Sequence, residues 1–435
     1  MKIIVTTAIV LLSLIFRFSA IAQEWSLEQC LQYAEQHNKD LLAQEEAVQA
    51  SISSQQASLS GLLPEITGRA EMNHYWQIPV QAFPAELVGG EPGTFVPVRI
   101  STPWTASFGA DASLKLIDPQ TWQSVKLSSL QVQMAEGELH SLKQQLLKNV
   151  RMSFHHVQSE KENLHAVRQL YDSYVEIHRL ITLQYEKGIT DQITFNQSLT
   201  LLNDRLEGRA QAGIALRAAY LDLKFWMGYP LNDSLTIQED AEMPELHLYE
   251  FNATQLPDYN LRSLQQIQAE QQWKVSRSRM LPNLSAVAGF QRVAFRNSFD
   301  FFEGGEWYNV GSIGLKLNIP ILSLRQMLYE PAQQKAQWKQ ASYQFDRYQE
   351  EQERVFQQEM MQLEQAYEVW QNQQENLRLA RQNEILSMSK IEKGIIDMLQ
   401  LRQIQDDLYR VQQRLSQARL DYLQHYVELT YLQDN

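Results

Sequence analysis

The sequence predicts an exported membrane protein of mixed class, in which a few β-strands per chain combine with very long α-helices and one structural unit occurs twice. Three observations predict this fold class. Short motifs recur about 200 residues further along the chain, far beyond the 20–50 residues of solenoid repeats. Four segments alternate apolar and polar residues as membrane strands do. Long segments contain almost no proline, and the last of them carries the heptad pattern of coiled coils.

The recurring motifs define an internal duplication. The matching pairs are EKGITD at 186–191 with EKGIID at 392–397, LLPEI at 62–66 with MLPNL at 280–284, and LKL at 114–116 with LKL at 315–317. We therefore predict a first structural repeat over 23–228 and a second over 258–435. The segment 229–257 is acidic and contains three prolines, so we interpret it as the linker between the repeats.

The first 22 residues are typical of an export signal. Lys2 is followed by an apolar core over 3–16, and Ala20-Ile21-Ala22 fits the small-residue cleavage pattern. After this leader no run of about 18 apolar residues follows, so no transmembrane helix is expected. The formal net charge of −13 and the lack of a basic cluster argue against a nucleic-acid partner.

The strands are predicted from strict alternation. In 104–116 every even-numbered residue is apolar, and the residues between them are polar or glycine. Segments 65–76, 283–295 and 307–319 follow the same rule with exceptions such as His74 and Val287, which gives two hairpins over 65–116 and 283–319. A soluble sandwich also alternates. The length of these strands and the long helical stretch between the hairpins favour a membrane sheet.

Four strands are too few to close a membrane barrel, since the smallest closed ones have about eight. Open sheet edges are not tolerated in hydrocarbon, so several copies of the chain must share one barrel. Three copies of four strands would give twelve. The expected lumen residues are Glu65, Arg69, Glu71, Asp111 and Lys115. The expected aromatic girdle at the lipid–water interface consists of Trp76, Trp104, Trp307 and Tyr308.

Long helices account for most of the remaining chain. Asp118-Pro119 is a typical helix start, and the predicted helices are 119–187, 189–227, 325–393 and 395–432, with shorter helices before each hairpin. At 1.5 Å per residue the first of them is roughly 100 Å long. The last shows a coiled-coil seam in Leu401, Ile404, Leu408, Val411, Leu415, Ala418 and Tyr422.

This order of elements resembles the TolC-like outer-membrane factor family over essentially the whole mature chain. The most specific motifs are the Leu-Pro hairpin entries at Pro64 and Pro282, the turns at Gly188 and Gly394, and SQARLDYL at 416–423. The resemblance implies a homotrimer in the outer membrane of a Gram-negative bacterium. Its twelve-stranded barrel would be continued by a helical tunnel into the periplasm. It further implies an exit duct that works with a periplasmic adaptor protein and an inner-membrane transporter, for efflux or for type I protein secretion.

The resemblance also implies site residues at the periplasmic end. In the family the turns between long helices receive the adaptor, and the matching residues here are Gly188, Ile189, Thr190, Asp191, Gly394, Ile395, Ile396 and Asp397. Some members close this end with aspartates six and nine residues after the second glycine. Here Gln400 and Gln403 occupy those places, so we expect a neutral constriction, with Asp397 as the alternative gate.

No sequence pattern indicates catalysis, a cofactor or a metal. The chain has no His-Glu-x-x-His, no Gly-x-Ser-x-Gly and no phosphate-binding glycine loop. His155 and His156 are adjacent, so on a helix they point about 100° apart and do not share a face. The remaining alternative is a periplasmic coiled-coil scaffold whose hairpins pack on themselves.

Overall fold

A computed structural model describes residues 24–238, 243–247, 249–392 and 398–433. The chain divides into two compact units. We call them the sheet unit, which comprises Gln49–Met134 and Leu264–Tyr343, and the helical unit, which comprises Met1–Val48, Ala135–Ser263 and Gln344–Asn435. The predicted export signal at 1–22 and the second turn, Gly394 to Asp397, lie outside the described residues.

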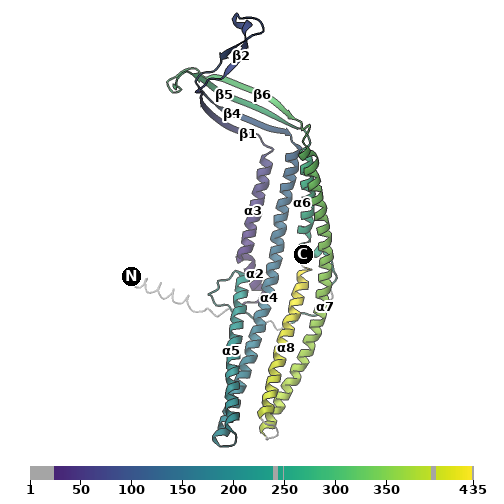
Figure 1. The fold of residues 1–435 in the computed structure, drawn as a ribbon. Coiled ribbons are helices and arrows are strands. Elements are labelled where there is room, and N and C mark those ends of the chain that lie inside the picture. Colours follow the sequence, from purple (N-terminus) through teal and green to yellow (C-terminus); the bar gives the residue numbers. More distant parts are fainter. Residues whose placement is uncertain (1–23, 239–242, 248, 393–397, 434–435) are drawn as a thin grey trace, which may run out of the picture. The chain divides into compact units, whose positions relative to one another are not determined.

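The sheet unit is built on one antiparallel sheet of four strands (Figure 1). The strands are β1 (Glu65–His74), β4 (Trp104–Ile117), β5 (Asn283–Arg296) and β6 (Tyr308–Asn318), in that spatial order. They form where the sequence alternates. Because β5 pairs with β4, the two predicted hairpins join into one sheet, and β1 and β6 are its edges.

The register gives this sheet one apolar and one polar face. Ile66 lies opposite Ala112, Ala112 opposite Ala288, and Ala288 opposite Ile313. Since directly opposed residues of antiparallel strands point to the same side, the even-numbered residues of β1, β4 and β5 share one face with the odd-numbered residues of β6. Many of its large apolar side chains are exposed in the single chain, Ile66 and Ile313 among them.

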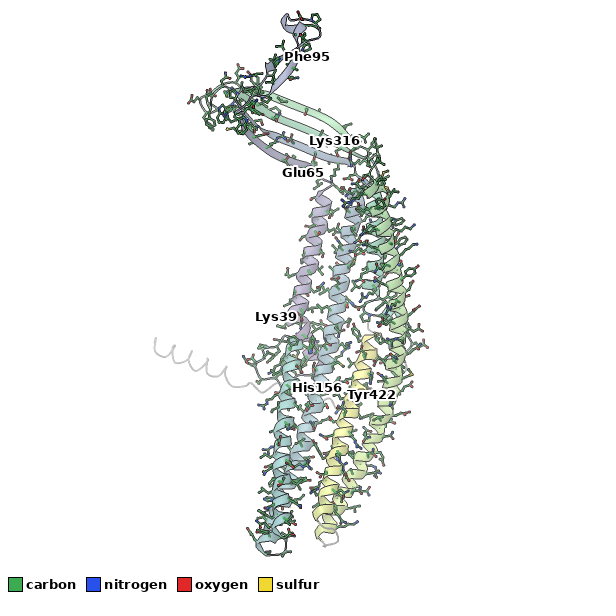
Figure 2. All side chains as sticks on the ribbon, viewed as in Figure 1. Lys39, Glu65, Phe95, His156, Lys316 and Tyr422 are labelled. Carbon is green, nitrogen blue, oxygen red and sulfur yellow. The ribbon has the colours of Figure 1, made fainter. Side chains whose placement is uncertain are left out.

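A second, smaller hairpin interrupts the first predicted one. β2 (Val80–Pro84) and β3 (Phe95–Arg99) pair with each other, and the short 3-10 helix η1 (Ala85–Val88) lies between them. The sequence analysis expected only a connecting loop here. This hairpin contains two prolines, Pro84 and Pro97. Proline is excluded from central strands because it cannot donate to the ladder, but it is compatible with a two-stranded ribbon, in which each strand is an edge. Phe95 of this hairpin is labelled in Figure 2.

The helices form where proline is scarce. They are α2 (Leu27–His37), α3 (Lys39–Ser60), α4 (Pro119–Glu186), α5 (Gln192–Met227), α6 (Tyr259–Ser278), α7 (Glu330–Glu392) and α8 (Met398–Tyr431), with a short π-helical turn over Arg325–Tyr329 before α7. Short 3-10 turns also occur, as at Ala253–Gln255. No helix within the described ranges is both long and apolar enough to cross a membrane.

In the helical unit four long segments lie in the order α5, α4, α8, α7 (Figure 1). His178 of α4 hydrogen-bonds Ser198 of α5 at 2.8 Å. Tyr422 of α8 stacks on Trp370 of α7, with the ring centroids 6.1 Å apart. Between the middle pair, Lys148 of α4 pairs with Glu428 of α8 at 3.1 Å. α5 and α7 are therefore the two outer helices of this layer.

Two apolar clusters hold the helical unit together. One packs α2 against α4 and α5 around Phe154, Leu223 and Met227, and it includes Ile237 of the linker. The other packs α7 against α8 around Leu363 and Tyr422, together with further linker residues. The acidic linker therefore covers both helix pairs with its apolar side chains.

The helix predicted to run from the Ser26 cap to about Ser60 is divided in two. The capping box of Ser26 and Gln29 begins α2, but the helix ends at Asn38, which has an extended conformation. The Asn38 side chain accepts from the Leu41 amide at 3.2 Å, so it caps α3, and it donates to the Trp226 carbonyl at 2.9 Å. This local side-chain hydrogen bonding competes with helix continuation.

Candidate channel-lining and docking sites

The polar face of the sheet contains all five predicted lumen residues. Glu65, Arg69 and Glu71 are odd-numbered residues of β1, and the register places them on the same side as Asp111 and Lys115 of β4. Arg69 and Asp111 form an ion pair at 3.3 Å, with both side chains about half exposed. Figure 2 shows Glu65 and Lys316 near the same end of the sheet. Acidic and basic groups thus alternate along a face that suits water rather than lipid.

Aromatic side chains cluster at the opposite end of the sheet, on its apolar face. Trp104 stacks on His74 at 4.2 Å, and Trp307 meets Phe108 at 5.0 Å, in both cases between ring centroids. Phe301, from the connection between β5 and β6, is buried and packs in one cluster with Ala106 and Ala294. Trp76 lies just beyond β1 and is 96% exposed.

Tyr308, the fourth residue predicted for the aromatic girdle, lies at the aromatic end of the sheet but on its polar face. It lies opposite Val293, which is on the polar face, and its hydroxyl donates to Glu306 at 2.8 Å. Because successive side chains of a strand point to opposite faces, Tyr308 and the next residue, Asn309, face opposite sides of the sheet. The place of Tyr308 in the girdle stays a prediction.

The first predicted docking turn is a tight helix reversal at the end of α4. Gly188 has φ +68, the left-handed conformation that glycine adopts at least cost. The Ile189 amide donates to the Gln184 carbonyl and the Gly188 amide to the Tyr185 carbonyl, both at 2.9 Å, which is a Schellman motif. This turn leaves Ile189 70% exposed, and Thr190 is half-buried beside it.

Asp191 begins the returning helix. Its carboxylate accepts from the Thr194 amide at 2.7 Å as the N-cap of α5. The hydrogen bonds from Thr194 hold the pKa of this carboxyl below its usual range. The ring of Tyr185, near the end of α4, stacks on the ring of Phe195, near the start of α5, with the centroids 5.0 Å apart. This contact joins the two helices beside the turn. The turn is thus a rigid support for an exposed isoleucine.

Gln400 and Gln403, the predicted constriction, lie near the start of α8 and are both exposed. Gln405, two residues further, is buried, and its side-chain oxygen lacks a hydrogen-bond partner in the described chain. The alternative gate residue Asp397 lies outside the described residues.

The nearby carboxylate of Asp406 takes part in a network that the sequence analysis did not find. It accepts from the Tyr174 hydroxyl of α4 at 2.8 Å and from the Arg205 guanidinium of α5 at 3.2 Å. Arg205 also lies over the Tyr174 ring, 4.9 Å from its centroid. Burial, and then the Asp406 carboxylate, raise the pKa of Tyr174 to about 12. The three residues tie the first helix pair to α8.

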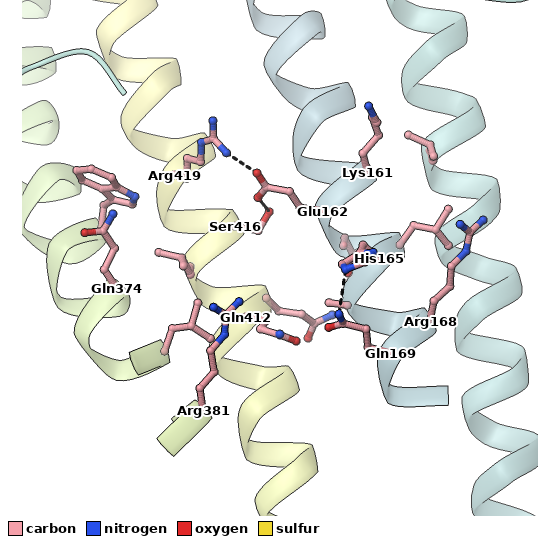
Figure 3. A pocket seen from close by; sticks show the side chains of 18 of the residues that line it. Lys161, Glu162, His165, Arg168, Gln169, Gln374, Arg381, Gln412, Ser416 and Arg419 are labelled. Carbon is pink, nitrogen blue, oxygen red and sulfur yellow. Dashed lines mark hydrogen bonds and ion pairs between the residues drawn. The ribbon is translucent and has the colours of Figure 1, made fainter. Parts of the chain in front are cut away.

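An open groove of about 770 Å³ lies in the helical unit, lined mainly by residues 161–169 of α4, 370–381 of α7 and 412–419 of α8 (Figure 3). At one end Arg419 pairs with Glu162, which also accepts from Ser416 at 3.2 Å. His165 and Gln169 hydrogen-bond at 2.9 Å through their Nε2 atoms. The lining is rich in amide and cationic side chains, and its carboxylate Glu162 is already paired with Arg419. Among the described residues no group of three His, Cys, Asp or Glu side chains could hold a metal.

The sequence analysis named neither Ile193 nor the network of Tyr174, Arg205 and Asp406, and only the first could have been found from a sequence pattern. Ile193, 67% exposed beside the turn, follows the recognised motif by two residues and could have been included. Tyr174, Arg205 and Asp406 come from three helices, and Tyr174 and Asp406 are 232 residues apart in the sequence, so no local spacing reveals their meeting.

The family model for outer membrane efflux proteins matches residues 30–228 and 261–433. The chain therefore belongs to the outer membrane efflux protein family, and both the predicted resemblance and the predicted outer-membrane location are confirmed.

Solved structures agree with this fold. The CmeC outer membrane channel of Campylobacter jejuni is 15% identical, with a TM-score of 0.76 over 93% of this chain and 85% of that one. VceC of Vibrio cholerae is 12% identical, with a TM-score of 0.75 over 93% and 95% of the two chains. The MtrE channel of Neisseria gonorrhoeae is 13% identical, with a TM-score of 0.74 over 93% and 88%. No curated protein matches the sequence significantly.

Proposed function

We propose that this chain is the outer-membrane exit duct of a tripartite efflux pump and that it conducts substrates passively from the periplasm to the exterior. In this role it acts as a homotrimer with a periplasmic adaptor protein and an inner-membrane transporter. The observation that carries the proposal is that both edge strands of an amphipathic sheet lack a pairing partner among the described strands. β1 pairs only with β4 and β6 only with β5 among the described strands.

A membrane sheet cannot keep such edges, because unpaired backbone groups in hydrocarbon cost several kcal/mol each. Pairing β6 of one copy with β1 of the next removes both edges. Three four-stranded sheets then close a barrel of twelve strands. Its apolar face meets lipid, and the face with Glu65, Arg69, Glu71, Asp111 and Lys115 lines the lumen.

The two outer helices of the helical unit, α5 and α7, each expose apolar side chains. α5 exposes a row of apolar side chains that α4 does not cover: Leu199, Leu206, Ile214, Leu221 and Phe225. α7 exposes another row: Met361, Val369, Leu379 and Leu386. At about 100° per residue each row occupies roughly a third of the helix circumference, as expected of a packing stripe. Contact between α5 of one copy and α7 of the next buries both rows.

Membrane extraction tests the duct directly. The mature protein should require detergent, run as a trimer by light scattering and form channels in planar bilayers. A monomer that remains soluble in buffer would support the coiled-coil scaffold and refute the duct. Co-purification with a protein-exporting transporter instead of an efflux transporter would assign the duct to type I secretion.

The exposed turn at Gly188–Asp191 is the proposed docking point for the adaptor, together with the corresponding residues Gly394, Ile395, Ile396 and Asp397. Ile189 is held outward by a rigid reversal, and an apolar side chain in that position suits a protein partner. The Ile189→Trp trimer should lose adaptor co-purification. Leu87→Trp is the matched control, because Leu87 is 73% exposed in the sheet unit. Equal recovery of adaptor by both variants would remove the turn from the interface.

A further inference from the structure

The apolar face of the four-stranded sheet carries two formally charged residues, Arg292 and Arg296, both in β5. Arg296 is neutralised within the chain, because it pairs with Asp300 at 3.4 Å and donates to the Glu306 carbonyl at 3.1 Å. Arg292 is exposed. Its side chain makes no hydrogen bond or ion pair with any residue that the structure describes.

The surroundings of Arg292 are amphipathic. The register places it between Phe108 of β4 and Asn309 of β6. Phe108 packs against Trp307, so the arginine lies at the level of the aromatic cluster. In membrane sheets such aromatic residues lie at the headgroup level. Asn309 is exposed on the same face and offers a second hydrogen-bond donor.

An isolated arginine on a lipid-facing surface is destabilising unless an anion compensates it. The cost is largest at the bilayer midplane and falls toward the interface. Near the interface the available anions are lipid phosphates, and the planar guanidinium fork fits a phosphate with two parallel hydrogen bonds.

We propose that Arg292, assisted by Asn309, binds the phosphate of a membrane lipid at the lipid–water interface. The inference rests on the proposed function, because it requires this face of the sheet to meet the membrane. Next to Arg292 on the same face, Phe290 and Ile313 are 56% and 89% exposed. They provide apolar contact for acyl chains. The surface therefore fits an amphiphile with an anionic head better than free phosphate.

Native mass spectrometry of the detergent-solubilised trimer tests the proposal, with diphosphorylated lipid A as the probe. The wild type should retain the lipid, and Arg292→Gln should bind it about tenfold or more weakly, because a charge-assisted hydrogen bond is lost. Arg292→Lys should bind with intermediate affinity, since it keeps the charge but loses the fork. Lys316→Gln is the matched control: it removes a cation from the opposite face of the same sheet and should bind as the wild type does.

Three results would overturn the inference. They are equal retention by the wild type and Arg292→Gln, equal retention of lipid A lacking its phosphates, and full displacement by inorganic phosphate at the lipid's own concentration. Channel conductance and trimer mass are recorded on the same samples. If both are normal while lipid binding ignores Arg292, the lipid site alone is refuted. If the wild type forms no trimer and no channel, the proposed duct is refuted.

Discussion

Single residues determine the geometry of the exposed turn. Gly188 has nothing within 4 Å of the position a Cβ would take, so space does not limit a substitution there. The backbone does, because φ is +68. Ile189 is exposed only because this one residue turns left-handed immediately before it.

Gly188→Ala should therefore destabilise the protein by about 1 kcal/mol through backbone strain. Gly208 in α5 is the matched control. A Cβ at Gly208 would also meet nothing within 4 Å, but this residue lies inside a helix, so Gly208→Ala should stabilise by about 0.5–1 kcal/mol. Thermal unfolding of both variants in detergent measures the difference. Destabilisation of equal size in both would contradict this account.

Asp191 gives the turn a pH dependence of known sign. Its folded pKa is lowered by the hydrogen bonds from Thr194, so the cap stabilises α5 above the usual aspartate pKa near 3.8. The stabilisation is lost as the pH falls through the lowered folded value. The protection factor of the Thr194 amide, which compares its exchange with that of an unstructured peptide at the same pH, should fall in that acidic window. Asp191→Asn keeps a neutral acceptor and should show no such step, whereas an identical step in that variant would assign the titration to another group.

At the scale of elements, the helical unit relies on cross-links between its two helix pairs. Asp406 receives hydrogen bonds from two different helices, and its partner Arg205 already has one buried nitrogen, Nε, without a partner in the described chain. Such a network is costly to break, because the remaining groups stay partly buried and unpaired.

Asp406→Asn should cost about 1–3 kcal/mol, since it removes the charge that pairs with Arg205. Asp407→Asn is the control one residue away. Asp407 pairs with Arg410 on the exposed side of α8, where a surface ion pair contributes less than about 1 kcal/mol. Chemical denaturation followed by circular dichroism compares the two variants, and a similar loss in both would show that the network is not the stabilising element.

At the scale of the whole molecule, several surfaces of the single chain are left uncovered. Both edge strands lack partners in the described chain, and both outer helices expose apolar rows. Assembly should therefore depend on those rows rather than on the monomer core.

The double variant Ile214→Asp with Leu221→Asp should dissociate the trimer, because two charges would be buried between α5 and α7 of neighbouring copies. Gln197→Asp with Gln211→Asp is the control. Both residues are exposed on α5, and at about 100° per residue they lie to one side of the apolar row. Light scattering in detergent measures the trimer fraction. If the first variant remains trimeric, α5 is excluded from the interface.

The sequence by itself determined which segments form strands and helices. Alternation with a period of two and long stretches without proline are local patterns, and each is typical of one backbone conformation. The sequence also indicated the glycine turn at 188 and the family. The β2–β3 ribbon, the break at Asn38 and the face of Tyr308 depended on hydrogen bonding or strand phase. Only the tertiary structure decided that β4 pairs with β5, that Tyr174, Arg205 and Asp406 meet, and that Arg292 is left without a counter-ion among the described residues. These follow from contacts between distant residues, which no local pattern encodes.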